Sequence, residues 1–354
     1  MGKSFVTGID IGHHSIKAVV LKSAGEQFEL VSYKEIPVSE GIFAENHTFS
    51  HQGIVKKLKE LKKQLPLMSR QVALALPDNA VISKLLHIDG DLEDREKEFA
   101  IYQVFGQQSP FPIEDLSLDY VKVEQDSLKR GTTATYQVYA TRKEVVESRV
   151  EVIKKSGFKP VVIDLQAHSL LRVWQLAAQQ QEDKQAWMMV DIGQSQTSIC
   201  IIPKGRPAYY KDLPYGMSNM PEATQKLDLN VVEFEHGESV IDLGKAKDSG
   251  IDHHEDEFIA ELADRLTRQM SLYGSVNQQT KIEGLWLTGG GACISGITEA
   301  LTQQLQIPVE VLNPFQLLES KKNKKVSNLA PCTFSVAAGL AIRGLQWQRR
   351  IHVA

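Results

Sequence analysis

The sequence lacks the features that mark secreted, membrane-spanning and nucleic-acid-binding proteins. Its three cysteines, Cys200, Cys293 and Cys332, form no CxxC pair, which argues against a disulfide framework or a cysteine metal site. No apolar run approaches the ~18 residues of a membrane-spanning helix, and the N-terminus holds no apolar stretch long enough for a signal peptide. A net charge of -4 and a pI near 6.2 disfavour a general nucleic-acid-binding surface. We therefore expect a cytoplasmic protein.

The composition is otherwise that of an ordinary globular protein. At 354 residues the chain is long for a single core, so we expect two lobes or two domains. Short apolar bursts at 5–12, 16–23 and 28–36 predict three strands joined by tight turns. Sequential strands with tight turns indicate an antiparallel or mixed start to a sheet.

Periodic patterns predict the elements that follow. Ile54, Val55, Leu58, Leu61 and Leu65 share one face of an amphipathic helix, and five lysines (56, 57, 59, 62 and 63) face outward. We interpret these lysines as a solvated helix face rather than a binding patch. Further strands are predicted at 70–78, 118–126, 134–142, 159–167, 285–288 and 309–314, and further helices after a cap at Asp91 and at 143–156, 169–181, 256–272 and 333–346.

An internal repeat is the most informative feature of the chain. Residues 187–202 repeat the pattern of residues 5–20: an apolar strand, Asp-Ile-Gly, a polar turn of three residues and a second apolar strand. Two lobes that each start with the same hairpin would place the two turns face to face.

Each Asp-Ile-Gly turn has the chemistry of a phosphate site. Glycine leaves backbone N–H groups open to phosphate oxygens, and Asp10 and Asp191 can hold Mg²⁺ through water, because magnesium prefers oxygen ligands and keeps several waters. Lys17 can place a positive charge near the phosphates. The expected nucleotide-contacting residues of the two turns are Gly12, His13, His14, Ser15, Gly193, Ser195 and Thr197.

A glycine-rich segment supplies the third part of the expected site. Gly289, Gly290, Gly291 and Ala292 follow a predicted strand and let the backbone lie flat against a ring or sugar. The helix expected directly after them would point its positive N-terminal end toward the phosphates.

The order of these three motifs resembles the phosphate 1, phosphate 2 and adenosine motifs of the actin, hexokinase and Hsp70 superfamily. The two connecting helices of that superfamily are expected at 164–171 and 337–343. Within it, the segments 8–17, 110–120, 162–171 and 309–315 resemble the PilM family of type IV pilus assembly proteins, which is related to FtsA. The likeness extends over about the first 200 residues and the last 75.

The resemblance implies an α/β, two-lobed actin-like ATPase (ribonuclease H-like) fold with an inserted subdomain of the 1C type. It places subdomain 1A at 1–84, 148–190 and 334–354, subdomain 1C at 85–147, subdomain 2A at 191–215 and 270–333, and a divergent subdomain 2B at 216–269.

The implied ligands are ATP and Mg²⁺. The implied partner is the cytoplasmic N-terminal peptide of a PilN-like inner-membrane protein, bound between 1A and 1C, with pilus motor ATPases and the platform protein as further partners. The protein would then lie at the inner membrane through its partner, with no nucleic-acid ligand. Six acids against two bases at 89–98 suit a basic peptide, although we favour a solvated helix face as their explanation.

The chain departs from the family pattern at Tyr215–Pro221, where relatives carry a Gly-Gly-x-x-Leu-Thr helix start and this chain has one glycine and a proline. In the family the small subdomain 2B helps to hold adenosine, so this departure predicts a lower affinity for nucleotide. We expect a protein that binds nucleotide with little or no hydrolysis.

Three alternatives remain open from the sequence. A small-molecule kinase or phosphatase of this superfold needs a carboxylate base near the γ-phosphate, and only Gln166, with Asp164 beside it, stands near that position. A polymerising protein like FtsA would be expected to carry an amphipathic membrane helix near its C-terminus, a pattern not seen at 349–354. A related assembly protein of a different pilus or secretion system is the third. The histidine pairs 13–14 and 253–254 are interpreted as solvated turns rather than metal ligands.

Overall fold

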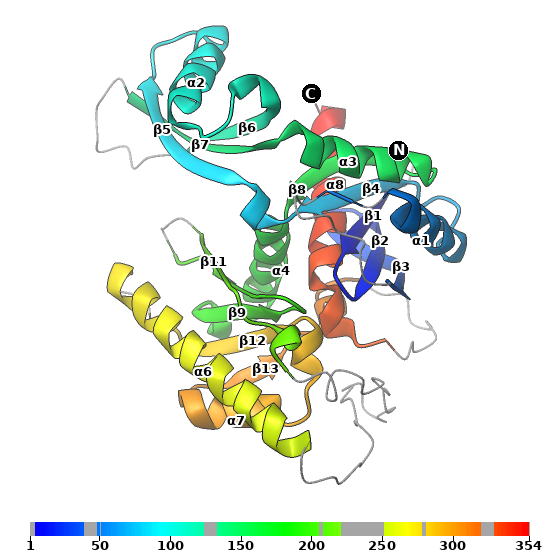
Figure 1. Ribbon diagram of the computed structural model, residues 1–354, viewed down its shortest axis with the longest axis vertical. Helices are drawn as coiled ribbons and strands as arrows, with labels where there is room; N and C mark the ends of the chain where they lie inside the picture. Colours follow the sequence, from blue (N-terminus) through cyan, green and yellow to red (C-terminus); the bar gives the residue numbers. More distant parts are fainter. Residues whose placement is uncertain are drawn as a thin grey trace.

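Two five-stranded sheets of identical topology form the two lobes (Figure 1). The computed structural model describes residues 4–38, 48–49, 51–123, 133–204, 208–220, 251–277, 281–319 and 329–353. The first sheet has the order β3-β2-β1-β4-β8 and the second β11-β10-β9-β12-β13. In each sheet the first three strands are antiparallel and the last two run parallel to the central strand. The predicted repeat is confirmed and extends from one hairpin to the whole sheet.

The strands of the first sheet are β1 (Phe5–Ile11), β2 (Ser15–Ala24), β3 (Gln27–Pro37), β4 (Gln71–Leu76) and β8 (Lys159–Leu165). Those of the second are β9 (Trp187–Ile192), β10 (Thr197–Ile201), β11 (Tyr209–Leu213), β12 (Gly284–Thr288) and β13 (Val309–Val311). Strand β11 was not predicted, because its sequence mixes tyrosines with charged residues and shows no apolar run.

Helices α1 (His51–Gln64) and α3 (Lys143–Lys155) cover the outer face of the first sheet. The predicted amphipathic helix is α1, and its residues Ile54, Leu58 and Leu61 are fully buried. One lysine differs from the expectation, because Lys62 Nζ donates a hydrogen bond of 2.8 Å to the carbonyl oxygen of Gly157.

Helices α4 (Gln166–Gln180) and α8 (Ser335–Val353) pack against each other between the lobes, where the two connecting helices were expected. Gly339 of α8 allows this approach, since a Cβ there would lie 2.1 Å from the carbonyl oxygen of Ser169 in α4. Helix α4 begins three residues before the predicted Ser169. Its N-terminus is stabilised from outside, by the Asp78 carboxylate that accepts the Ala167 N–H at 3.0 Å.

A third layer is inserted between β4 and α3. It consists of β5 (Ile82–Asp89), α2 (Asp94–Gln108), β6 (Leu116–Val123) and β7 (Thr133–Arg142), with the antiparallel order β5-β7-β6. Helix α2 and the sheet enclose a separate core that includes Leu86, Phe105 and Val138. The predicted cap at Asp91 is wrong. Helix α2 starts at Asp94, and a reciprocal capping box between Glu93 and Glu96 stabilises its N-terminus. Strand β5 was not predicted either.

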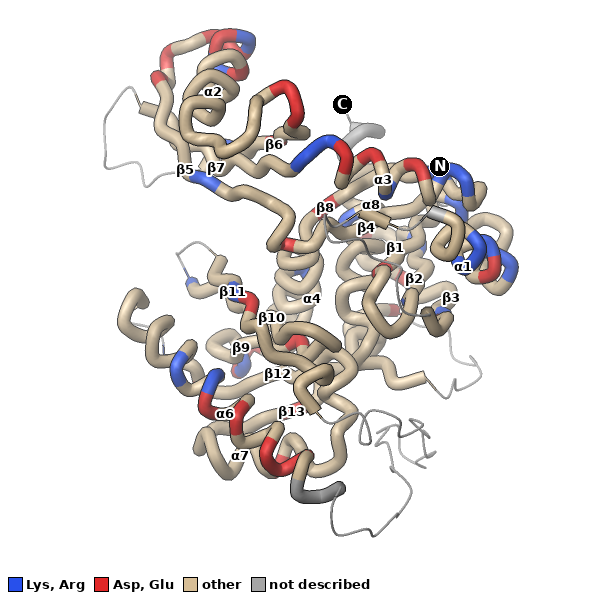
Figure 2. The backbone as a smooth tube through the Cα atoms, in the orientation of Figure 1, with Lys and Arg blue, Asp and Glu red and all other residues tan. Residues whose placement is uncertain are grey.

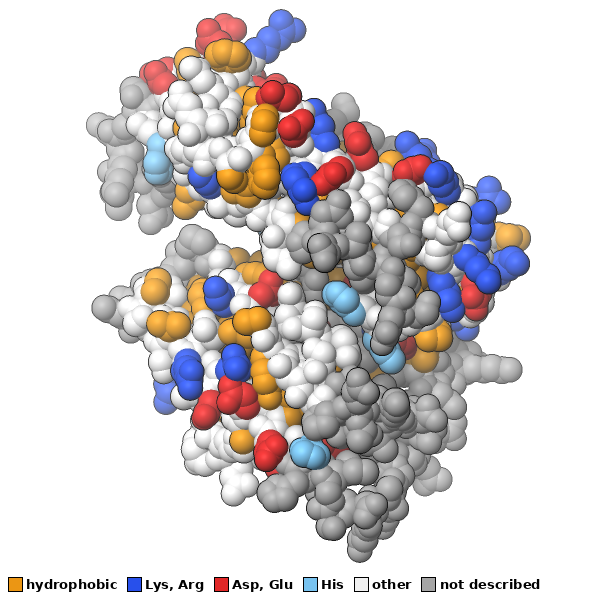
Figure 3. Space-filling model, in the orientation of Figure 1, with side chains coloured by type: hydrophobic (Ala, Val, Ile, Leu, Met, Phe, Trp, Pro, Cys, Tyr) orange, Lys and Arg blue, Asp and Glu red, His pale blue; other side chains and the backbone are white. Residues whose placement is uncertain are grey.

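The second lobe is completed by α6 (Ile251–Val276) and α7 (Ile297–Leu305). Helix α6 extends the predicted helix at both ends. The helix predicted after the glycines is α7, which begins only after Gly296, where φ is 72°. Gly290 and Gly291 themselves form the start of a 3-10 turn, η5 (Gly290–Cys293). The space-filling view is hollowed between the inserted layer and the second lobe (Figure 3). Across the described ranges, no helix has both the length and the hydropathy required to cross a bilayer.

Candidate functional site

The two Asp-Ile-Gly hairpins have the same backbone geometry. In the first turn the Gly12 N–H donates to the Ser15 carbonyl at 3.0 Å, and in the second the Gly193 N–H donates to the Gln196 carbonyl at 2.9 Å. Each turn therefore spans four residues between the last paired residues of its strands. This equivalence comes from the glycine at the first turn position and the apolar strands on either side.

Strand register decides which side chain stands beside each aspartate. Asp10 is paired with Lys17 across β1 and β2, and Asp191 is paired with Ser198 across β9 and β10. Lys17 and Ser198 thus occupy equivalent positions in the repeat. The hairpins place a cation next to the first carboxylate and a hydroxyl next to the second.

The two carboxylates lie close enough to influence each other. Burial, followed by the negative charge of Asp10, raises the pKa of Asp191 to about 7 against the opposing effect of Lys17. Burial also raises the pKa of Asp10, while Lys17 lowers it. Since Asp10 and Asp191 come from different lobes, this coupling supports the expectation that the turns face each other.

This pair fits a divalent cation held through water. Two partly desolvated carboxylates with raised pKa values need a positive counter-charge to stay ionised together. Within the described segments no cluster of three or more His, Cys, Asp and Glu side chains could hold a metal ion. Asp10 and Asp191 would leave most positions around an ion to water, which suits Mg²⁺ better than a metal that requires a protein cage.

Two of the predicted phosphate donors are already engaged. The Ser15 hydroxyl is 2% exposed and donates to Glu35 Oε1 at 2.5 Å. The Thr197 hydroxyl is fully buried and donates to the Tyr215 carbonyl at 2.7 Å. Both hydroxyl protons are therefore used within their own lobes, that of Ser15 toward β3 and that of Thr197 toward the segment after β11.

Lys17 is positioned by the same network in the first lobe. Its Nζ lies 2.8 Å from Ser15 Oγ and 3.5 Å from the Glu35 carboxylate. Strand β3 therefore orients the lysine that faces Asp10. The sequence analysis missed Glu35, although it pairs with Lys17 across β2 and β3 and so lies on the same face of the sheet.

A hydrogen-bond network between the lobes was also missed. The Tyr210 hydroxyl lies 2.7 Å from Asp212 Oδ1 and 2.9 Å from Asp78 Oδ2, so it joins β11 of the second lobe to the segment after β4 in the first. Ser198 donates to the same Asp212 oxygen at 2.6 Å. Burial and the charge of Asp212 raise the pKa of Asp78 to about 7. Since a phenol has one proton to donate, the bridge is satisfied on both sides only when a carboxyl group keeps a proton.

The glycine segment after β12 is fixed against the second hairpin. Gly289 has a φ of 84°, and a Cβ there would meet the Ile192 carbonyl oxygen at 2.5 Å. A Cβ at Gly291 would meet the Ile192 side chain at 2.2 Å, whereas one at Gly290 would meet no atom within 4 Å. Ala292 is buried. Of the four predicted contact residues, Gly290 is therefore the one that borders open space.

The segment that departs from the family pattern caps the second turn. The Met217 and Ser218 N–H groups donate to the carbonyls of Gly193 and Gln194 at 2.9 and 2.7 Å. Gly216 permits this contact, because a Cβ there would lie 2.7 Å from backbone atoms of the turn. A single glycine thus suffices for the packing at this position. Most of the predicted subdomain 2B, residues 221–250, lies outside the described residues.

Asp164 serves as the centre of an ion-pair cluster. Its carboxylate lies 2.8 Å from Arg172, 3.2 Å from Arg343 and 2.9 Å from His168 Nδ1. Burial alone would raise the pKa of Asp164, but the hydrogen bond from His168 and the charge of Arg172 lower it to about 2. A carboxylate held this firmly in its ionised form is a poor proton acceptor. Asp164, the acid nearest to the expected base position of a kinase, is therefore unsuited to that role.

Comparison with known proteins identifies a matching family and similar solved structures. The chain matches the family described as type IV pilus assembly protein PilM over residues 8–345. A solved structure titled PilM-PilN type IV pilus biogenesis complex is similar with a TM-score of 0.75 and 23% identity, over 96% of this chain and 98% of that one.

Two further solved structures share the fold at lower similarity. The ethanolamine utilization protein EutJ from Carboxydothermus hydrogenoformans has a TM-score of 0.53 and 16% identity, over 97% of this chain and 90% of that one. A diol dehydratase-reactivating factor in nucleotide-free form has a TM-score of 0.55 and 8% identity, over 98% and 100%. The predicted two-lobed actin-like fold is confirmed, while the subdomain boundaries stay a prediction.

Proposed function

The chain belongs to the family of type IV pilus assembly protein PilM, and on that premise we propose that it is a nucleotide-binding scaffold of the pilus machinery. It binds the cytoplasmic N-terminal peptide of a PilN-like inner-membrane protein and so connects the membrane complex to the pilus motor ATPases and platform protein. Its place is the cytoplasmic side of the inner membrane.

The proposed nucleotide binding is supported above all by two carboxylates, Asp10 and Asp191, which occupy equivalent positions of the two hairpins. The charge of Asp10 contributes to the raised pKa of Asp191. They would hold Mg²⁺ through water, and the ion would supply the charge that binds the phosphates of ATP. Lys17 adds positive charge on the side of the first lobe. The open side of Gly290 leaves room for the nucleoside.

Support for a scaffold rather than a kinase comes from the two residues that the sequence analysis placed nearest the base position. Asp164 is committed to Arg172, Arg343 and His168, and Gln166 has no carboxylate to accept a proton. Nucleotide would therefore act by selecting a lobe arrangement. The Tyr210 bridge between Asp78 and Asp212 crosses the lobes, so a small change in lobe angle would break or form it.

The outer face of the inserted sheet is suited to an extended peptide. Leu85 of β5 and Val121 of β6 both pair with Gln137 of β7, so the three side chains form one row across the sheet. Leu85 is 57% exposed and Val121 55%, which is high for strand hydrophobics. A peptide beside this row would bury both side chains.

The acidic run 89–98 contributes less to the peptide site than its composition suggests. Glu93 and Glu96 form the capping box of α2, and Asp94 pairs with Lys97 at 3.3 Å. The start of a helix accounts for these charges. The apolar row is therefore the stronger feature for peptide recognition.

Fluorescence anisotropy tests the proposal with a labelled peptide from the N-terminus of the neighbouring PilN-like protein, with and without Mg-ATP. We expect saturable micromolar binding that shifts when Mg-ATP is added. Val121→Ser should weaken binding, whereas Val311→Ser, which changes an exposed valine of β13 in the second lobe, should leave it unchanged. Absence of peptide binding under both conditions would reject the scaffold function.

A further inference from the structure

The lysines of α1 fall into two groups. Lys62 donates to the Gly157 carbonyl, and Lys57 lies 3.9 Å from Glu60. Lys56, Lys59 and Lys63 are exposed and have no hydrogen bond or ion pair to any described residue. Their spacing of three and four residues places them along one side of the helix.

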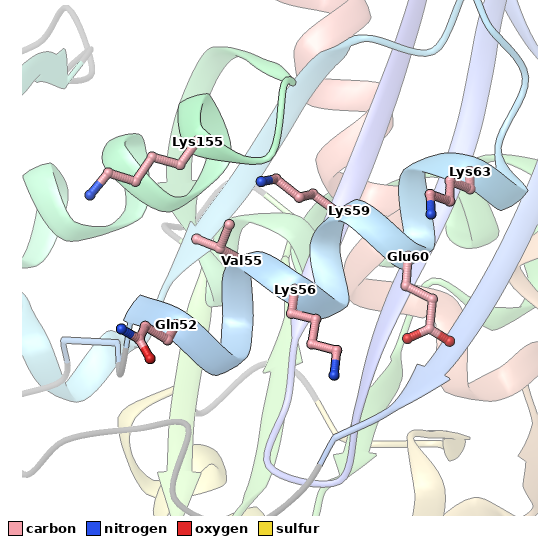
Figure 4. Close-up of a pocket in the computed structure, with 7 residues that line it drawn as sticks. All are labelled: Gln52, Val55, Lys56, Lys59, Glu60, Lys63 and Lys155. Atoms are coloured by element: carbon pink, nitrogen blue, oxygen red, sulfur yellow. The ribbon is translucent and has the colours of Figure 1, made fainter.

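An open hollow of about 630 Å³ lies against these three lysines. Lys155 of α3 stands on the other side of it, across from Lys59 and Val55 (Figure 4). The lining is completed by Gln52 and Glu60. Lys155 is paired with Glu151 and Glu60 with Lys57, so the excess positive charge of the hollow comes from Lys56, Lys59 and Lys63. A hollow with this lining suits a phosphate-bearing group.

Two of the most exposed large hydrophobic residues follow directly after this helix. Leu67 is 87% exposed and Met68 66%, in the loop between α1 and β4. The exposed Arg70 follows after the buried Ser69, and the Arg70 carbonyl accepts the N–H of the exposed Lys159 at 2.8 Å. Basic side chains thus surround an apolar tip.

The charge of this region is opposite to that of the whole protein. Segments 51–70 and 151–159 hold nine basic and two acidic residues, although the chain has a net charge of -4. Figure 2 shows the basic residues gathered along α1, at the end of the first lobe that lies away from the inserted layer. Helix dipoles account for lysines in the last turns of α1 and α3, but not for Lys56, Lys59 or the exposed Leu67.

We propose that this surface, which consists of Lys56, Lys59, Lys63, Leu67, Met68, Arg70 and Lys155, docks on an anionic phospholipid bilayer. The cations contact lipid phosphates, and Leu67 and Met68 enter the interfacial layer. An acidic protein segment would satisfy the charges, but two large apolar side chains at the tip of a basic patch fit a membrane interface better. The inference does not rest on the proposed pilus function, because it requires neither the partner peptide nor nucleotide.

Vesicle co-sedimentation of the full chain tests this surface. The protein should sediment with phosphatidylglycerol vesicles, not with phosphatidylcholine vesicles, and the binding should be lost at about 1 M salt, where charges are screened within about 3 Å. Since each lysine near an anionic membrane contributes roughly fivefold, the triple variant K56Q/K59Q/K63Q should lower the affinity about 100-fold. The matched variant K122Q/K204Q/K281Q, which removes three exposed lysines elsewhere, should bind as the parent does.

Two further measurements test the apolar residues Leu67 and Met68 and the alternative ligand, an acidic protein segment. The variant L67S/M68S keeps every charge and should still weaken vesicle binding at least tenfold. Fluorescent polyglutamate provides the test for an acidic protein segment. Failure of the parent to sediment with phosphatidylglycerol vesicles, equal losses in both triple variants, or binding of polyglutamate but not of vesicles would overturn the membrane assignment.

Discussion

Replacing Asp191 by asparagine should stabilise the protein while removing its response to Mg-ATP. Burial and the charge of Asp10 raise the pKa of Asp191 from 3.8 to about 7. The native state therefore binds this proton more tightly than the unfolded state does. As the pH rises from about 4 to about 7, the unfolded state releases the proton first, and the parent loses stability over that window.

The size of the effect follows from the shift. A difference of about three pKa units corresponds to about 4 kcal/mol above pH 7, so asparagine should recover on the order of 2–4 kcal/mol when coupling to Asp10 is allowed for. For a chain of this length that amounts to a rise in Tm of about 5 °C. The gain should shrink to near zero at a pH below about 3, where the parent carboxyl is neutral in both states.

Differential scanning fluorimetry across this pH range measures the difference directly. Asp183→Asn is the control, because it removes an exposed carboxylate and should leave Tm unchanged. Added Mg-ATP should raise the Tm of the parent and not of Asp191→Asn. If Asp191→Asn is no more stable than the parent at pH 8, or if it keeps the Mg-ATP response, the assignment of the carboxylate pair is wrong.

Four further changes test other parts of the site. Gly216→Ala places a methyl group 2.7 Å from the backbone of the second turn and should cost about 2 kcal/mol in urea denaturation, whereas Gly290→Ala, in open space, should change stability by less than about 0.5 kcal/mol. Tyr210→Phe removes the bridge between the lobes, so small-angle scattering should show a larger radius of gyration; an unchanged radius would contradict this role. Asp164→Asn should cost about 3 kcal/mol, because it removes the counter-charge of the half-buried Arg172 and Arg343. Since the pKa of Asp164 is lowered from 3.8 to about 2, this loss should be full above a pH of about 4 and should disappear as the pH falls from about 4 to about 2. Chelation of Mg²⁺ should abolish ATP binding in isothermal titration calorimetry, and equal affinity without the ion would count against the carboxylates as its ligands.

The hairpins, the order of the motifs and the two connecting helices could be predicted because each depends on a short segment. Asp10 and Asp191 were identified in this way, from a strand, a glycine and a turn. Helix α4 shows the limit of the method. Its first turn is stabilised by Asp78, a residue 89 positions away in the chain, so no local signal marks the start of the helix.

The residues that the sequence analysis missed are those whose role depends on contacts between strands or lobes. Tyr210 and Asp78 lie 132 positions apart, and neither belongs to a recognisable motif. Ser15 and Thr197 were assigned to phosphate because they lie at a turn, whereas strand register directs the Ser15 hydroxyl to Glu35 of β3 and the Thr197 hydroxyl to the Tyr215 carbonyl after β11. Register is fixed by the pairing of whole strands, which a motif of a few residues does not reveal.

The two halves of the repeat have diverged in a way that, on the proposed function, would make a metal ion necessary for nucleotide binding. Lys17 and Ser198 occupy equivalent positions, but Lys17 is shared with Glu35, and Ser198 donates to Asp212. The second hairpin therefore faces the first with Asp191, whose pKa is raised by burial and by the negative charges of Asp10 and Asp212. A polyphosphate entering beside these carboxylates meets more negative charge than Lys17 neutralises. Mg²⁺ would neutralise the carboxylates and the phosphates together, so the same charge pattern that disfavours free ATP favours its magnesium complex.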